Sequence, residues 1–197
     1  LKNKGELINY KNTDYGGNFL GKLPKISQNK LSRMFYNFWY PEKRLFIEPT
    51  IKRFKTYTEE IRNKCHPKEL SKIKIQILLD ITKINNSYSC RSYTVFDKYR
   101  SYFHHPIDNK GLAFINIIMD IYEIERRKMQ NRLDSENLTI NRIKYIYKNT
   151  LSRAEIKVNK FVKECDNNMD INSLKKWNEY VFDELGIDNI WLFRGAE

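Results

Sequence analysis

The sequence predicts an all-α protein, a single compact bundle of about seven helices. Two observations support this prediction. The 197 residues include only 7 Gly and 5 Pro, a scarcity that favours long elements over many short strands and turns. Apolar residues also recur at steps of three and four along most of the chain, which is the spacing of one face of an α-helix.

Residues 1–26 are expected to form an irregular N-terminal arm, because Gly and Pro crowd together towards their end. The all-helical domain is expected over residues 27–197. Its first helix covers 27–40, where Ser27 is a suitable N-cap and Pro41 stops the helix.

Three more helices are expected in the first half of the chain. The second covers residues 49–65 and begins with proline, whose missing N–H costs no hydrogen bond at the first helical position. The third begins at Pro67 and breaks near residues 85–87. Its apolar stripe consists of Leu70, Ile73, Ile77 and Ile81. The fourth covers residues 92–103.

The broadest apolar stripe lies in residues 111–133, which are expected to form the most buried helix. The last helix is expected over 170–186, with Gly186 just past its final turn, where glycine is favoured. The tail that follows is apolar from Ile190 to Phe193, and we expect it to pack on the bundle or on a neighbouring subunit.

Between these two helices, residues 139–165 are expected to form a helix with two distinct faces. The apolar face consists of Ile143, Tyr147, Ala154, Val158 and Phe161. The basic face consists of Arg142, Arg153, Lys157 and Lys160. This basic face is either a binding surface for an acidic polymer or the solvated side of an ordinary amphipathic helix.

The formal net charge is +12, from 36 Lys and Arg against 24 Asp and Glu. Such a charge attracts polyanions, which include nucleic acid, anionic membranes and acidic proteins. Codon bias is an alternative explanation, because the abundant Lys, Asn, Ile, Tyr and Phe all have AT-rich codons. No apolar run reaches the roughly 18–20 residues of a membrane span. Binding to a membrane surface is also disfavoured, because the apolar stripes opposite the basic residues are needed for the core.

Signatures of catalysis are missing from the sequence. It contains no GxxxxGK[ST], GxGxxG or GxSxG motif. The three cysteines match no zinc or redox spacing, which indicates reduced thiols in a cytosolic or nuclear protein. The three histidines are explained by a helix end and by a loop before proline. We therefore expect no enzymatic activity, no cofactor and no metal site.

Basic residues on helix faces are the one pattern with a binding mechanism. Neutralising phosphates releases counterions, and these contacts position a nucleic acid without reading its sequence. The 13 Tyr, 11 Phe and 3 Trp offer stacking surfaces for unpaired bases, so single-stranded or loop RNA suits the chain better than duplex DNA. The expected RNA-binding residues are Arg142, Arg153, Lys157, Lys160, Lys52, Arg53, Lys55, Arg126 and Arg127.

A small, basic chain with reduced cysteines, helical periodicity and this Asn, Lys, Ile and Tyr bias resembles the gametocyte-specific RNA-binding phosphoproteins of malaria parasites. The resemblance covers the character of the whole chain and rests on no motif, so it assigns no functional residue. It implies an all-helical, cytoplasmic homodimer that binds RNA, is phosphorylated and acts in sexual differentiation, with signalling proteins as further partners. The proline-rich ligand motif linked to that family is not found, because no PxxP occurs here.

The exported helical domain of the same parasites is a competing resemblance. Its recurrent tryptophan pattern is not evident, because Trp39, Trp177 and Trp191 are too few and too scattered. The basic helix faces therefore predict a non-enzymatic RNA-binding protein, and the first resemblance implies a homodimeric regulator of gametocyte development. The alternative is a helical protein-interaction module that binds an acidic or cytoskeletal partner.

Overall fold

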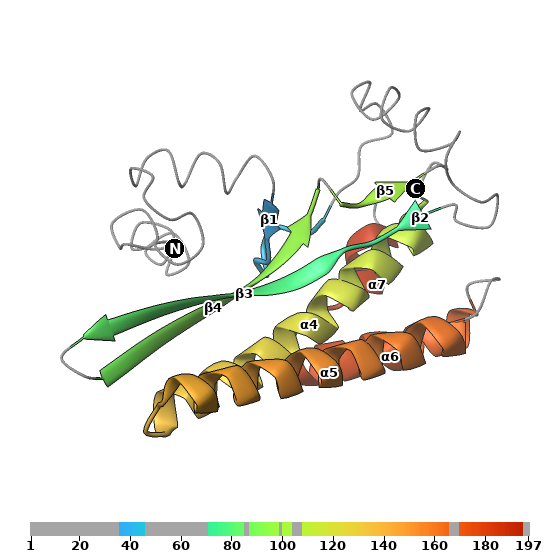
Figure 1. Ribbon diagram of the computed structural model, residues 1–197. Helices are drawn as coiled ribbons and strands as arrows, with labels where there is room; N and C mark the ends of the chain where they lie inside the picture. The colour runs from blue at the N-terminus through green and yellow to red at the C-terminus, as the bar shows by residue number, and fades with distance from the viewer. Residues whose placement is uncertain are drawn as a thin grey trace.

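The computed structural model of the protein describes residues 36–45, 71–84, 87–98, 100–103, 108–165 and 170–194. Within these residues, antiparallel strands precede four helices along the chain. Figure 1 shows the strands as one layer, with α4 lying along the hairpin and α5 and α6 running beside each other below it.

The main sheet has three antiparallel strands in the order β1-β4-β3. The strands are β1 (Tyr36–Phe38), β3 (Ile75–Ile84) and β4 (Ser87–Asp97). Strands β3 and β4 pair along their whole length, from Ile75 opposite Phe96 to Ile84 opposite Ser87, and make one long hairpin. A separate two-stranded sheet joins β2 (Ser71–Lys72) to β5 (Tyr102–Phe103).

The prediction of an all-α bundle of seven helices is wrong, because the described residues form a mixed α/β fold. The error comes from a real ambiguity in spacing. Ile73, Ile77 and Ile81 are four residues apart, and residues four apart share a face in a strand as well as in a helix. Ile75 and Leu79 complete an alternation of period two, and β-branched residues favour strands.

Three predicted helices are corrected on this basis. The helix expected over 27–40 is contradicted by strand β1, and the helix expected from Pro67 is replaced by β2 and β3. The helix expected over 92–103 is replaced by β4 and β5. The predicted arm over 1–26 and the predicted helix over 49–65 lie outside the described residues.

The predicted helices of the second half are confirmed, with boundaries one or two residues away. They are α4 (Asn109–Ser135), α5 (Ile140–Cys165) and α6 (Ile171–Leu185), and a short α7 (Asn189–Arg194) follows. Their ends have ordinary capping chemistry. Asp108 Oδ1 accepts a hydrogen bond of 2.7 Å from the Gly111 N–H, and Asp170 accepts from Ser173 N–H. Gly186 ends α6 with φ of 72°, a left-handed conformation that glycine adopts without strain.

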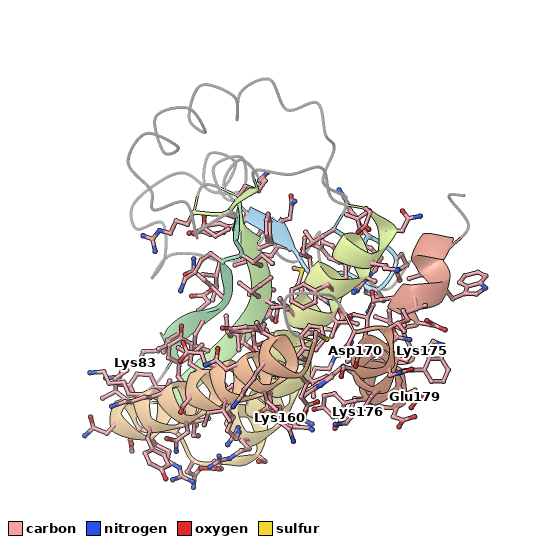
Figure 2. The ribbon with its side chains drawn as sticks, turned by 90° about the vertical axis from the view of Figure 1, so that its right-hand side faces the viewer. Lys83, Lys160, Asp170, Lys175, Lys176 and Glu179 are labelled. Carbon is pink, nitrogen blue, oxygen red and sulfur yellow. The ribbon has the colours of Figure 1, made fainter. Side chains whose placement is uncertain are left out.

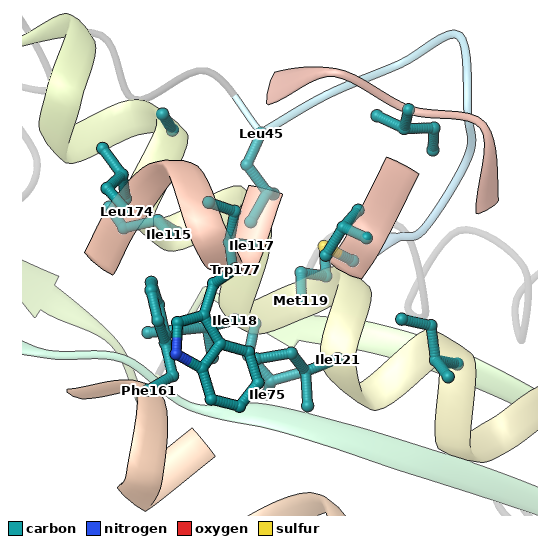
Figure 3. Packing of buried hydrophobic residues seen from close by; sticks show 14 of the residues in the cluster. Leu45, Ile75, Ile115, Ile117, Ile118, Met119, Ile121, Phe161, Leu174 and Trp177 are labelled. Carbon is teal, nitrogen blue, oxygen red and sulfur yellow. The ribbon is translucent and has the colours of Figure 1, made fainter. Parts of the chain in front are cut away.

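The hydrophobic core lies between the sheet and the helices. Helix α4 is its centre, as expected, because it contacts the sheet and each of the other three helices. Phe161 of α5 and Trp177 of α6 pack with their ring centroids 5.5 Å apart and their planes tilted by 58°, beside the isoleucines of α4 (Figure 3). A second cluster, which includes Ile77, Met129 and Ile146, joins the hairpin to α4 and α5.

A buried polar cluster joins α4 to α7 and to the segment that follows β1. The Asp120 carboxylate on α4 is fully buried and accepts hydrogen bonds from Trp39 Nε1, Arg44 Nη2 and Asn189 Nδ2. Burial raises the pKa of Asp120, although the Arg44 charge and these hydrogen bonds oppose the change. The cluster fixes α7 against α4. The expected packing of the tail on the bundle is confirmed for Ile190, which packs against the main hydrophobic cluster. Trp191, in contrast, is 70% exposed.

Candidate nucleic-acid interface

Helix α5 carries more positive charge than any other described element. It contains seven Lys or Arg residues, and its acids are Glu155 and Glu164. The apolar side of α5 is as predicted, because Ile143, Ala154 and Phe161 are completely buried. The structure describes six of the nine predicted RNA-binding residues, and Lys52, Arg53 and Lys55 lie outside the described ranges.

Arg153 and Lys157 of α5 meet in the structure at one buried carboxylate of α4. Arg153 Nε lies 2.9 Å and Lys157 Nζ 2.8 Å from the oxygens of Glu125, whose side chain is 2% exposed. Burial alone would raise the pKa of Glu125, but the hydrogen bonds and charges of Lys157 and Arg153 outweigh it and hold the pKa below its ordinary value. Lys157 also donates a hydrogen bond of 2.7 Å to the Tyr180 hydroxyl. These two cations therefore join α4, α5 and α6.

Arg126 and Arg127 also share one buried carboxylate, that of Glu123. Both Nε atoms donate to it, at 2.7 and 3.0 Å. Arg126 Nη1 also donates to the Ser92 carbonyl of β4 at 3.2 Å, and the Arg127 guanidinium lies 5.1 Å from the centroid of the Trp39 ring. These two arginines therefore connect α4 to the sheet.

The last two predicted residues form exposed ion pairs. Arg142 Nε lies 2.6 Å from Glu136, and this hydrogen bond lowers the pKa of Glu136. Lys160 Nζ lies 3.8 Å from Glu164, which also accepts hydrogen bonds from Lys176 and from Trp177 Nε1. Figure 2 shows Lys160 of α5 and Lys176 of α6 on the same side of the molecule. All six described residues therefore face a carboxylate, which cancels much of their charge.

Three other lysines of α5 have no ion pair within the described part of the chain. They are Lys144, Lys148 and Lys163, and all three are exposed. The helical repeat places Lys148 and Lys163 on the side opposite the buried residues Ile143 and Phe161, and Lys144 on the flank between the two sides. We call these three residues the lysine stripe.

An exposed aromatic ring lies within the lysine stripe. Tyr145 directly follows Lys144 and is 55% exposed. The Arg142 guanidinium lies 5.5 Å from the centroid of the Tyr145 ring, on the same exposed part of α5. An exposed tyrosine beside exposed lysines offers a base-stacking surface next to phosphate-binding groups.

The sequence prediction missed the lysine stripe, although a signal for it was present. Lys148, Ser152, Asn159 and Lys163 are separated by four, seven and four residues, which is the polar line opposite the apolar stripe. The prediction chose residues nearer the boundary of the two faces. Long side chains at that boundary can reach acids on neighbouring helices, and Arg153 and Lys157 do so.

The described cysteines have no features of nucleophiles. Cys90 and Cys165 are buried, and burial raises the pKa of each thiol to about 11. In the described ranges, no group of three or more His, Cys, Asp or Glu side chains is placed to hold a metal ion. None of the described helices is long and apolar enough to cross a membrane.

No protein-family model, curated protein or solved structure matches this chain. No functional residue is therefore transferred to it from a relative. The resemblance to the gametocyte phosphoproteins stays a prediction, and its all-helical part is contradicted by the sheet.

Proposed function

We propose that this protein is a non-enzymatic RNA-binding protein that holds the phosphates of single-stranded or loop RNA on the lysine stripe of α5. The observation that supports the proposal is the combination of three exposed lysines, Lys144, Lys148 and Lys163, which have no ion pair among the described residues, with the exposed ring of Tyr145. Lysine ammonium groups attract the phosphates of RNA, and binding releases the counterions of those phosphates. The tyrosine ring can stack on a base of single-stranded RNA.

The net charge of +12 supports a polyanion as the ligand. The charge is also unevenly distributed in the described residues. Helix α6 contains Glu179, Asp183 and Glu184 against two lysines, whereas α5 is strongly basic. Phosphates are therefore attracted to the α5 side. The contacts are to the phosphate backbone, so they give affinity across many sequences.

The test compares two variants that change the net charge equally. The stripe variant carries Lys148→Glu and Lys163→Glu. The control variant carries Lys110→Glu on α4 and Lys175→Glu on α6, both at exposed positions outside the stripe. Affinity for a fluorescein-labelled single-stranded RNA of mixed sequence is measured by anisotropy at low salt.

We expect the stripe variant to lose at least about tenfold in affinity, because two phosphate contacts become repulsive, and the control to lose much less. Equal losses in the two variants would show that only the overall charge matters and would contradict a local interface. Wild-type protein that fails to bind RNA at low salt would contradict the proposed function itself.

A further inference from the structure

The main sheet has two outer edges, one formed by β1 and β4 and the other by β3, and their backbone groups have different partners. Beyond β1, the open edge of β4 is capped by a glutamine of α4. The Gln130 amide accepts a hydrogen bond of 2.9 Å from the Ser92 N–H and donates one of 2.9 Å to the Cys90 carbonyl. Arg126 also donates to the Ser92 carbonyl. Side chains therefore replace a neighbouring strand on this side.

The register shows which backbone groups of β3 face the opposite edge. The Asp97 N–H donates to the Lys74 carbonyl at 2.9 Å, so the even-numbered residues of this strand bond to β4. The N–H and C=O groups of the odd-numbered residues therefore point away from β4. Ile77 is one of these, and its carbonyl accepts a hydrogen bond of 2.8 Å from the Tyr147 hydroxyl.

The odd-numbered residues closer to the hairpin tip have no such cap. Within the described part of the chain, the outward backbone groups of Leu79, Ile81 and Lys83 have no hydrogen-bond partner. The pairing of β3 with β4 is continuous here, and this segment contains no proline or bulge to disturb its edge. We call Leu79, Ile81 and Lys83 the β3 edge.

A row of alternating donors and acceptors of this kind is matched by the backbone of another extended chain. Side chains beside the β3 edge define the chemistry of that chain. Leu79 and Ile81 are half-buried and pack against the second hydrophobic cluster, as Tyr147 and Leu151 of α5 also do, which provides apolar contacts on the helix side. A segment with apolar residues at alternate positions fits this side.

The charges beside the β3 edge favour an acidic segment. Lys83 is exposed at its end, and Lys144 of α5 lies one helical turn before Tyr147, which touches β3. Neither lysine has an ion pair within the described residues. Asp80 is the one acid of β3, and it lies opposite Arg91 on the other face of the sheet. A second copy of this chain fits less well, because it carries the same Lys83 and a net charge of +12.

We propose that the β3 edge binds an extended segment of an acidic protein partner, which adds a strand to the sheet. The segment alternates apolar residues with Asp or Glu. This interaction uses backbone groups of the hairpin, whereas RNA binding uses side chains of α5, and Lys144 belongs to both surfaces.

The test uses a fluorescein-labelled nine-residue peptide that alternates Glu and Val, with a Lys and Val peptide for comparison. Ile81→Pro removes an outward N–H that makes no bond to β4, and prolines are tolerated at such edge positions. Ile81→Ala is the matched control, because it removes the same side chain and keeps the N–H. Circular dichroism verifies that both variants fold.

We expect the Glu peptide to bind wild-type protein more tightly than the Lys peptide does. We expect Ile81→Pro to bind it about tenfold more weakly than Ile81→Ala, because a hydrogen bond is lost and the proline ring blocks the approach. Ile81→Pro keeps its RNA affinity, which separates this proposal from the RNA interface. Equal peptide affinities of the two variants, or no binding to wild-type protein, would overturn the proposal.

A second measurement does not depend on the proline variant. Amide hydrogen exchange of wild-type protein is followed with and without the Glu peptide. We expect the peptide to slow exchange at Leu79, Ile81 and Lys83, whose N–H groups become bonded. Unchanged exchange at all three residues with the peptide bound would place it elsewhere and overturn the proposal.

Discussion

Glu125 of α4 and Lys157 of α5 form an ion pair of 2.8 Å in which the carboxylate is almost completely buried. Arg153 also donates a hydrogen bond to Glu125, and the Tyr180 hydroxyl of α6 accepts one from Lys157. The pair connects three helices, and residues that the sequence suggested as RNA ligands are therefore part of the framework. This relationship gives the first two predictions.

Replacing Lys157 by Met is expected to destabilise the protein by about 1–3 kcal/mol, because Glu125 keeps a buried charge with one partner fewer. Urea unfolding measures the change. Lys163→Met is the control, since Lys163 is exposed and has no ion pair in the described ranges. We expect the control to change stability by less than about 0.5 kcal/mol. Similar losses in both variants would show that the pair contributes nothing specific.

The stability that Glu125 provides is expected to depend on pH. Its folded-state pKa lies below the ordinary value of 4.5, so its contribution is complete above that value. The contribution is lost as the pH falls through the folded-state pKa. Urea unfolding at pH 7 and pH 3 is compared for wild-type protein and Glu125→Gln. Wild-type protein is expected to be more stable than Glu125→Gln at pH 7, and the difference in stability is expected to be smaller at pH 3. The same difference at both pH values would contradict this account.

The Asp120 cluster is expected to hold α7 in place. Asn189 donates to Asp120 at 2.7 Å and accepts from Arg44 at 2.9 Å, so Asn189→Ala leaves two buried charged groups with fewer partners. We expect a loss of about 1–3 kcal/mol in urea unfolding. Asn141→Ala, at an exposed position on α5, is the control. A loss no greater than in the control would show that the cluster does not stabilise the fold.

Self-association, which the apolar tail suggests, stays a prediction. Substitutions on the exposed face of α7 can test it. Trp191 is 70% and Leu192 is 43% exposed, and burying such side chains between two subunits is favourable. Light scattering at micromolar concentration is expected to show a dimer that Trp191→Ser shifts towards monomer. Ile156→Ser, at a position on α5 that is 64% exposed, serves as control. Monomer at every concentration would contradict the prediction.

The fold could be predicted where the spacing of apolar residues fits a helix but not a strand. It could not be predicted where the same spacing fits both. Residues 111–133 carry apolar side chains at both three and four residue steps, which a strand cannot place on one face, and they form α4. Within the described residues, the stripe of Ile73, Ile77 and Ile81 contains steps of four alone, which fit both structures; its one step of three starts at Leu70, outside the described residues. The alternation through Ile75 and Leu79 was the signal that decides for a strand.

The sequence could identify the helix that carries the candidate interface, but not which of its cations form it. Sequence spacing separates the apolar and basic sides of α5, and the structure confirms the apolar side. Which cations are free depends on acids that are distant in the sequence. Glu125 lies 28 residues before Arg153 and 32 before Lys157. These ion pairs depend on how α5 packs on α4, and a prediction with the wrong fold class could not identify them.

The salt dependence of RNA binding tests the central claim most directly. Anisotropy titrations of a single-stranded RNA are made at several salt concentrations with wild-type protein and with a variant carrying Lys148→Gln and Lys163→Gln. Each phosphate contact on a single strand contributes about −0.7 to the slope of log affinity against log salt. We predict a wild-type slope of about −2 or steeper, from the three stripe lysines, and a slope shallower by about 1.4 in the variant. Equal slopes in the two proteins would contradict the assignment of the lysine stripe as the phosphate-binding surface.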